Sequence, residues 1–129
     1  MNGAIAGLVA ITAAPSAPTA GAALMIGAVG GIIVYFSIII LDRRFGIDDP
    51  VGAISAHGVV GIWGVMAVCF TGGSFWDQFV GVLAIAGFTY AMSLLTILFI
   101  DRFIPIRATD EEQEVGLDAT ETGVKSTTY

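Results

Sequence analysis

Three long runs without a charged residue constrain this chain more than any other feature. They cover residues 20–41, 51–76 and 78–100. As a helix, each run is long enough to cross a hydrocarbon core of about 30 Å. A fourth apolar segment, residues 3–14, is shorter and stops before Pro15 and Pro18, which break a helix. We therefore expect an all-α membrane protein.

The composition agrees with this interpretation. Of 129 residues, 56% are hydrophobic and 12% are charged. That charged share is about half of what soluble domains carry. The 17 glycines fit membrane helices that pack closely through small residues. We expect helices near residues 2–14, 22–41, 50–71 and 77–103, which together form a transmembrane region over residues 1–105.

The charges are unevenly distributed. Six of the eleven acidic residues lie in residues 108–129, so residues 106–129 are expected to form an acidic, solvated tail. The five Lys and Arg residues lie between the first and second long runs or after the third. By the positive-inside rule both places are expected to be cytoplasmic. No basic patch exists, which argues against nucleic-acid binding.

His57 is the only histidine, and it lies inside the second charge-free run. An ionisable side chain is costly within a membrane helix, so by default it marks a substrate or ion pathway. Ala53, His57 and Gly61 are spaced four residues apart, which predicts one shared helix face. The alternative is a buried histidine that bonds to a carbonyl of a neighbouring helix. Without further information the two readings are about equally supported.

The residues before His57 predict the start of its helix. Asp49 suits the N-cap, Pro50 suits the first helical position, and Asp48 adds negative charge near the positive helix end. We favour this capping role over direct substrate contact.

Catalytic chemistry finds little support in the sequence. With no second histidine and no intramembrane carboxylate, we expect neither a metal nor another cofactor. Ser55 lies two residues from His57 and points elsewhere on the helix, so a nucleophilic triad is unsupported. Cys69 is the only cysteine, which excludes an intrachain disulfide. We do not expect an enzyme.

The motif around His57 resembles the tenth transmembrane helix of the ammonium transporter family (Amt/Mep/Rh). The resemblance rests on Asp-Asp-Pro at 48–50, His-Gly at 57–58 and Gly-Ile-Trp-Gly at 61–64. Residues 2–13, 20–44 and 78–102 resemble the eighth, ninth and eleventh helices, and residues 105–118 resemble the cytoplasmic tail. The resemblance implies the C-terminal third of such a transporter: a partial helix bundle with the last four transmembrane helices.

The same resemblance implies a function and partners. It implies transport of ammonium or ammonia across the cell membrane by a multi-pass homotrimer, with His57 as the second of two pore histidines. It also implies that Gly116, Leu117 and Asp118 contact a PII-type signalling protein. The alternative from the sequence is a small membrane subunit without transport, which packs against a full-length transporter in a structural or regulatory role.

Overall fold

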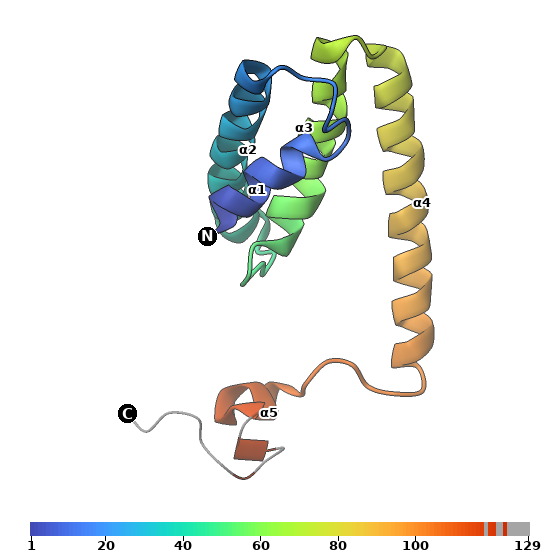
Figure 1. The fold of residues 1–129 in the computed structure, drawn as a ribbon. Coiled ribbons are helices and arrows are strands. Elements are labelled where there is room, and N and C mark those ends of the chain that lie inside the picture. Colours follow the sequence, from blue (N-terminus) through green and yellow to red (C-terminus); the bar gives the residue numbers. More distant parts are fainter. Residues whose placement is uncertain (118, 121–122, 124–129) are drawn as a thin grey trace. The chain divides into compact units, whose positions relative to one another are not determined.

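The computed structural model describes residues 1–117, 119–120 and 123, and every regular element within them is helical (Figure 1). This confirms the predicted all-α fold class. Two compact units, Met1–Ala86 and Gly87–Tyr129, make up the chain. The elements, in chain order, are α1 (Asn2–Ile11), α2 (Ala20–Ile40), η1 (Leu41–Phe45), η2 (Ile54–Val59), α3 (Val60–Ala67), η3 (Val68–Thr71), α4 (Phe75–Asp101) and α5 (Asp110–Val115).

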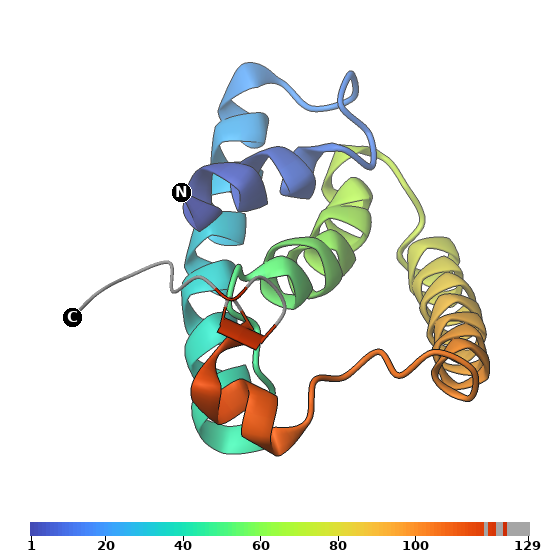
Figure 2. The same ribbon diagram turned by 90° about the horizontal axis from the view of Figure 1, so that it is seen from below.

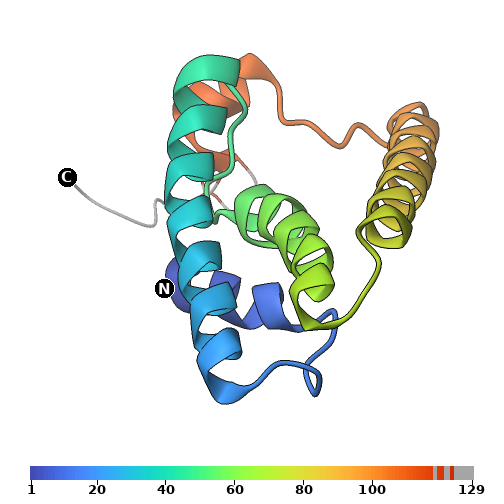
Figure 3. The same ribbon diagram turned by 90° about the horizontal axis from the view of Figure 1, so that it is seen from above.

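In the described part of the chain, three continuous helical stretches are long and apolar enough to cross a membrane. They are Ala20–Phe45, Ile54–Thr71 and Phe75–Asp101. The ten residues of α1 rise only about 15 Å, roughly half the thickness of the hydrocarbon core. In the first unit α1 lies across both α2 and α3, as the views from below and above show (Figures 2 and 3).

The crossing of these three helices depends on small residues. The Gly7 and Gly27 backbones approach so closely that a Cβ on either would lie within 3.6 Å of the other's carbonyl oxygen. A Cβ on Gly30 would lie 2.9 Å from the Ala10 Cβ, and one on Gly64 would lie 2.7 Å from the Ala10 carbonyl oxygen. The buried apolar residues around them are also mostly small: Ala6, Ala10, Ile26, Val34, Ala56, Val60 and Ala67.

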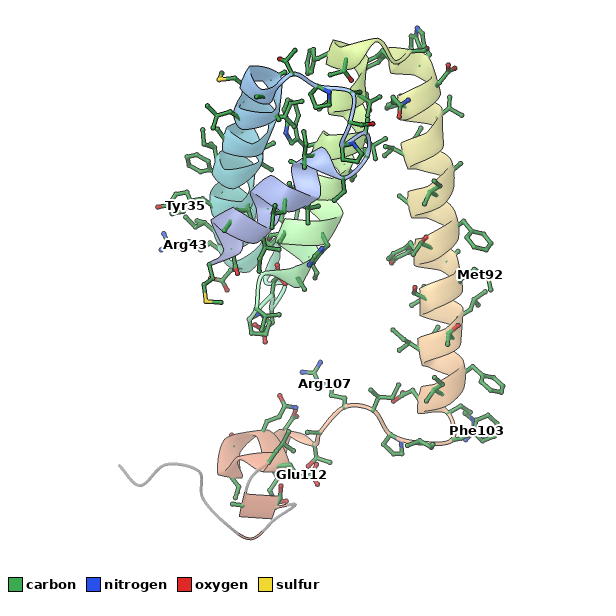
Figure 4. The ribbon with its side chains drawn as sticks, viewed as in Figure 1. Tyr35, Arg43, Met92, Phe103, Arg107 and Glu112 are labelled. Carbon is green, nitrogen blue, oxygen red and sulfur yellow. The ribbon has the colours of Figure 1, made fainter. Side chains whose placement is uncertain are left out.

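Large apolar side chains point away from this crossing. Tyr35 is 62% exposed and extends outward from α2 (Figure 4). Further exposed side chains on the same helix are Leu24, Met25, Ile32, Phe36 and Ile40. Small residues inside and large apolar residues outside are typical of helices that pack against one another in lipid.

The first helix ends earlier than the predicted residue 14. After Ile11, the Thr12 N–H bonds to the Val9 carbonyl at 3.2 Å, and the Thr12 hydroxyl donates to the same oxygen at 2.8 Å. These bonds tighten the last turn. Ala14 then precedes Pro15, which disfavours the α conformation there.

The helix predicted over residues 50–71 also begins later than residue 50. Residues 49–52 form a turn in which the Gly52 N–H donates to the Asp49 carbonyl at 2.9 Å. Gly52 has a φ of 72°, in the left-handed region, so the regular helix is established only from Ile54. By contrast, α2 and α4 each begin two residues before the predicted position.

A Gly64→Ala substitution tests the small-residue crossing. The added methyl group would press against the Ala10 backbone, so we expect a loss of about 1–3 kcal/mol in the free energy of unfolding. Gly61→Ala is the matched control on the same helix, because a Cβ at Gly61 meets open space. Denaturant titration of both variants in lipid nanodiscs checks this. Equal stability of the two variants would contradict the crossing as described.

Candidate functional site

His57 lies in η2, a wide helical turn that continues directly into α3. At its end the Val60 N–H reaches the Ser55 carbonyl, five residues back, as well as the His57 carbonyl. Such π-type turns are rare and frequently occur at functional sites. The local backbone around His57 therefore differs from an ordinary α-helix.

The η2–α3 segment has two different sides. The side that packs against α1 and α2 is buried and consists of Ser55, Ala56, Val60, Gly64 and Ala67. On the other side, Ala53 and His57 are exposed and Gly61 is half-buried. The structure thus brings the three predicted pathway residues onto one face, and His57 is exposed on it.

The imidazole of His57 is the polar group on this face. A neutral imidazole can accept a proton at one nitrogen and donate a hydrogen bond from the other. The small and apolar neighbours Ala53, Gly58 and Gly61 carry no charge that would hold an ion in place. Within the described residues, no three His, Cys, Asp or Glu side chains gather to hold a metal.

Two hydrogen bonds join this segment to α2, and neither was predicted from the sequence. Near its start, the buried Ser37 hydroxyl donates to the buried Ser55 hydroxyl at 3.0 Å. Two turns further on, the Trp63 indole N–H donates to the Ile26 carbonyl at 3.1 Å. A serine on an otherwise apolar helix face was the available signal, because a buried hydroxyl requires a partner.

Asp49 caps the start of the segment, although it lies five residues before Ile54 in the sequence. Its two carboxylate oxygens accept the N–H groups of Ile54 and Ser55, each at 3.0 Å. Partial burial raises the pKa of this carboxyl, but the hydrogen bonds from Ser55 and Ile54 outweigh it, so the pKa lies below its ordinary value of 3.8. Pro50 occupies the preceding turn rather than the first helical position, and Asp48 is exposed there.

Comparison with known proteins identifies the family. A family model described as Ammonium Transporter Family matches residues 1–127. The chain belongs to the ammonium transporter family.

Curated relatives of this ammonium transporter family member come from several kingdoms. It is 35% identical to the ammonium transporter of Bacillus subtilis, over 98% of this chain and 35% of the relative. It is 36% identical to ammonium transporter Amt2 of Archaeoglobus fulgidus, over 93% of this chain and 30% of the relative. The chain thus spans about a third of the length of the curated relatives it matches. No solved structure gives a significant match.

The tail of this family member contains a short helix that the sequence analysis did not predict. Thr109 and Glu112 form a capping box: the Glu112 N–H donates to the Thr109 hydroxyl at 3.3 Å, and the Thr109 N–H donates to the Glu112 carboxylate at 2.8 Å. The Thr109 hydrogen bonds lower the pKa of Glu112. The Thr-x-x-Glu spacing was the signal for this helix.

The residues expected to contact a signalling protein follow α5 directly. Gly116 ends the helix with a φ of 95°, and the Leu117 side chain is exposed. Asp118 lies outside the described residues.

The Asp49 contacts generate a prediction on pH. Because the folded-state pKa of this carboxyl is lowered, its stabilising effect is present above the ordinary value of 3.8 and is lost as pH falls through the folded-state pKa. We expect Asp49→Asn to lower the thermal midpoint at neutral pH and to flatten its decline in acid. Asp48→Asn, which alters the exposed neighbour, is the matched control. Identical acid profiles for Asp49→Asn and the parent would contradict the assignment.

Proposed function

We propose that this chain is the C-terminal third of an ammonium transporter and that the face bearing His57 lines its transport pathway. The family assignment supports ammonium as the transported species. One structural observation carries the pathway assignment: η2–α3 buries one side against α1 and α2 while His57, Ala53 and Gly61 remain on the other. A costly ionisable residue on an unburied helix face calls for a functional partner.

The chemistry of ammonium suits an imidazole in apolar surroundings. Moving bare NH4+ through hydrocarbon is prohibitive, because the ion loses its hydration shell. Neutral NH3 crosses far more easily. Histidine titrates near neutral pH, so as a residue type it can take up a proton and also hydrogen-bond to the neutral amine. A lysine or aspartate at position 57 would hold an ion instead of passing it.

The pathway requires segments beyond this chain. A single exposed helix face encloses no passage, and the chain spans about a third of the length of its relatives. We propose that the remaining helices of a complete transporter cover the face of Ala53, His57 and Gly61. Their residues would supply the first pore histidine, which partners His57.

The orientation and assembly follow the same proposal. Arg43 and Arg107 are exposed. By the positive-inside rule both would lie on the cytoplasmic side together with the acidic tail. The complete transporter would form a homotrimer in the cell membrane. A PII-type signalling protein would contact the tail at Gly116, Leu117 and Asp118.

Removing the imidazole tests the pathway role. The chain would be joined to the preceding helices of the Bacillus subtilis relative, and uptake of ammonium and methylammonium would be measured in cells. We expect His57→Ala and His57→Gln to change uptake or ion selectivity, because glutamine hydrogen-bonds but cannot carry a proton. Ile62→Ala, an exposed residue on the same helix, is the control. Unchanged uptake and selectivity in both His57 variants would refute the pathway role.

The 129-residue chain alone is expected not to conduct. In liposomes that contain a pH-sensitive dye, an ammonium gradient should give no signal above that of empty liposomes, because the His57 face is uncovered. Co-expression with the preceding helices should restore conduction, since separate membrane helices can insert and then associate. No restoration with correctly inserted partners would favour a non-transporting subunit. A clear signal from the chain alone would indicate a self-assembled pore.

A further inference from the structure

A short hydrogen-bonded series runs from the loop before η2 into the interior of the first unit. The Ser37 hydroxyl on α2 donates to the Ser55 hydroxyl at 3.0 Å. The Ser55 N–H donates to the Asp49 carboxylate at 3.0 Å. Ser55 is fully buried and Ser37 is 8% exposed. This series ties the loop, η2 and α2 together at one residue.

Ser55 and His57 lie on opposite sides of the same turn. They are two residues apart, Ser55 is buried, and His57 is exposed. In a helix, residues two apart point in nearly opposite directions. Any rotation of the turn about its axis therefore moves both side chains together, so a bond that fixes Ser55 also fixes the direction of His57.

The turn itself needs such a constraint. Its π-type hydrogen bonding is uncommon, and the same residues could wind as an ordinary α-helix. Rewinding would rotate His57 relative to α3 beyond it. The Trp63 bond to the Ile26 carbonyl holds α3 on the far side of His57 but does not reach into the turn. The Ser37–Ser55 bond ties the beginning of the turn to α2, beside the bonds that Asp49 accepts from the Ile54 and Ser55 N–H groups.

We propose that Ser37 and Ser55 are positioning residues that set the direction of the His57 imidazole. They act through the backbone of η2 and do not touch the transported species. The geometric part of this inference stands on the chain alone, whereas its consequence for transport rests on the proposed function.

The test uses the single histidine of the chain as its probe. The 129-residue chain, labelled with 15N-histidine in lipid nanodiscs, gives imidazole signals from His57 only. The variants are Ser37→Ala, Ser55→Ala and the double variant, with Ser37→Thr as the conservative replacement. An apolar groove lined by Ile33, Ser37 and Val59 leaves room for the extra methyl group of threonine. Thr96→Ala is the control, since that hydroxyl bonds only within its own helix, to the Met92 carbonyl.

The double variant separates positioning from stability. Each single variant leaves a buried hydroxyl without its partner and should lower the unfolding midpoint, whereas removing both hydroxyls should restore most of it. A positioning role predicts that the His57 signals of the double variant are nonetheless shifted or split into several. Ser37→Thr and Thr96→Ala should keep the parental signals.

Several outcomes would overturn the inference. If the double variant keeps the His57 signals of the parent, Ser37 and Ser55 do not position the imidazole. If the double variant shows altered His57 signals and its unfolding midpoint stays as low as in the single variants, Ser37 and Ser55 have a purely structural function.

In the joined transporter, the double variant should reduce ammonium uptake several-fold relative to Thr96→Ala. Shifted signals with unchanged uptake would support the positioning and count against the pathway role of His57. The failure of the inference and the failure of the proposed function are therefore distinguishable.

Discussion

Close approach of helix backbones is the constraint on which the first unit depends. In lipid, burying apolar surface gives helices little reason to associate, so their contact must come from van der Waals packing at short range. Such packing requires residues without bulk at the crossing. Ala10 of α1 occupies this position, with Gly30 of α2 and Gly64 of α3 on its two sides. As a consequence, residue size and not polarity distinguishes the inside of the bundle from its outside: small residues lie inside, and aromatic residues such as Tyr35 lie outside.

This constraint explains what could be predicted from the sequence. Membrane-spanning helices need long apolar runs, and the runs are visible without knowledge of their packing, so the three spanning stretches were predicted to within a few residues at most ends. Helical spacing alone also places Ala53, His57 and Gly61 on one face. What spacing does not provide is the side on which that face lies. The structure supplies this, because Gly64 and Ala67 turn the opposite side toward α1 and α2.

The features that sequence reasoning missed depend on contacts between distant residues or on single backbone angles. Gly52 is one glycine among 17, and nothing in its neighbours requires the positive φ that delays the helix to Ile54. The Ser37–Ser55 bond joins residues 18 positions apart, so it becomes apparent only when α2 and η2 are placed together. The helix α5 is different, because its Thr109–Glu112 capping box is a local signal, which the acidic composition of the tail obscured.

The two sides of η2–α3 differ in character, and a rotation about the helix axis would exchange them. The inner side of η2–α3 is small where it packs against α1, and under the proposed function its outer side presents a single imidazole. Successive residues of an α-helix are separated by about 100°, so a slip of one residue would bring His57 toward the packed interior and Ser55 toward the open face. In this chain α4 has no buried residue, and its Thr96 hydroxyl bonds within the helix itself. Polar bonds between helices are therefore found where direction matters: Asp49 and Ser37 hold Ser55 before His57, and Ile26 holds Trp63 after it.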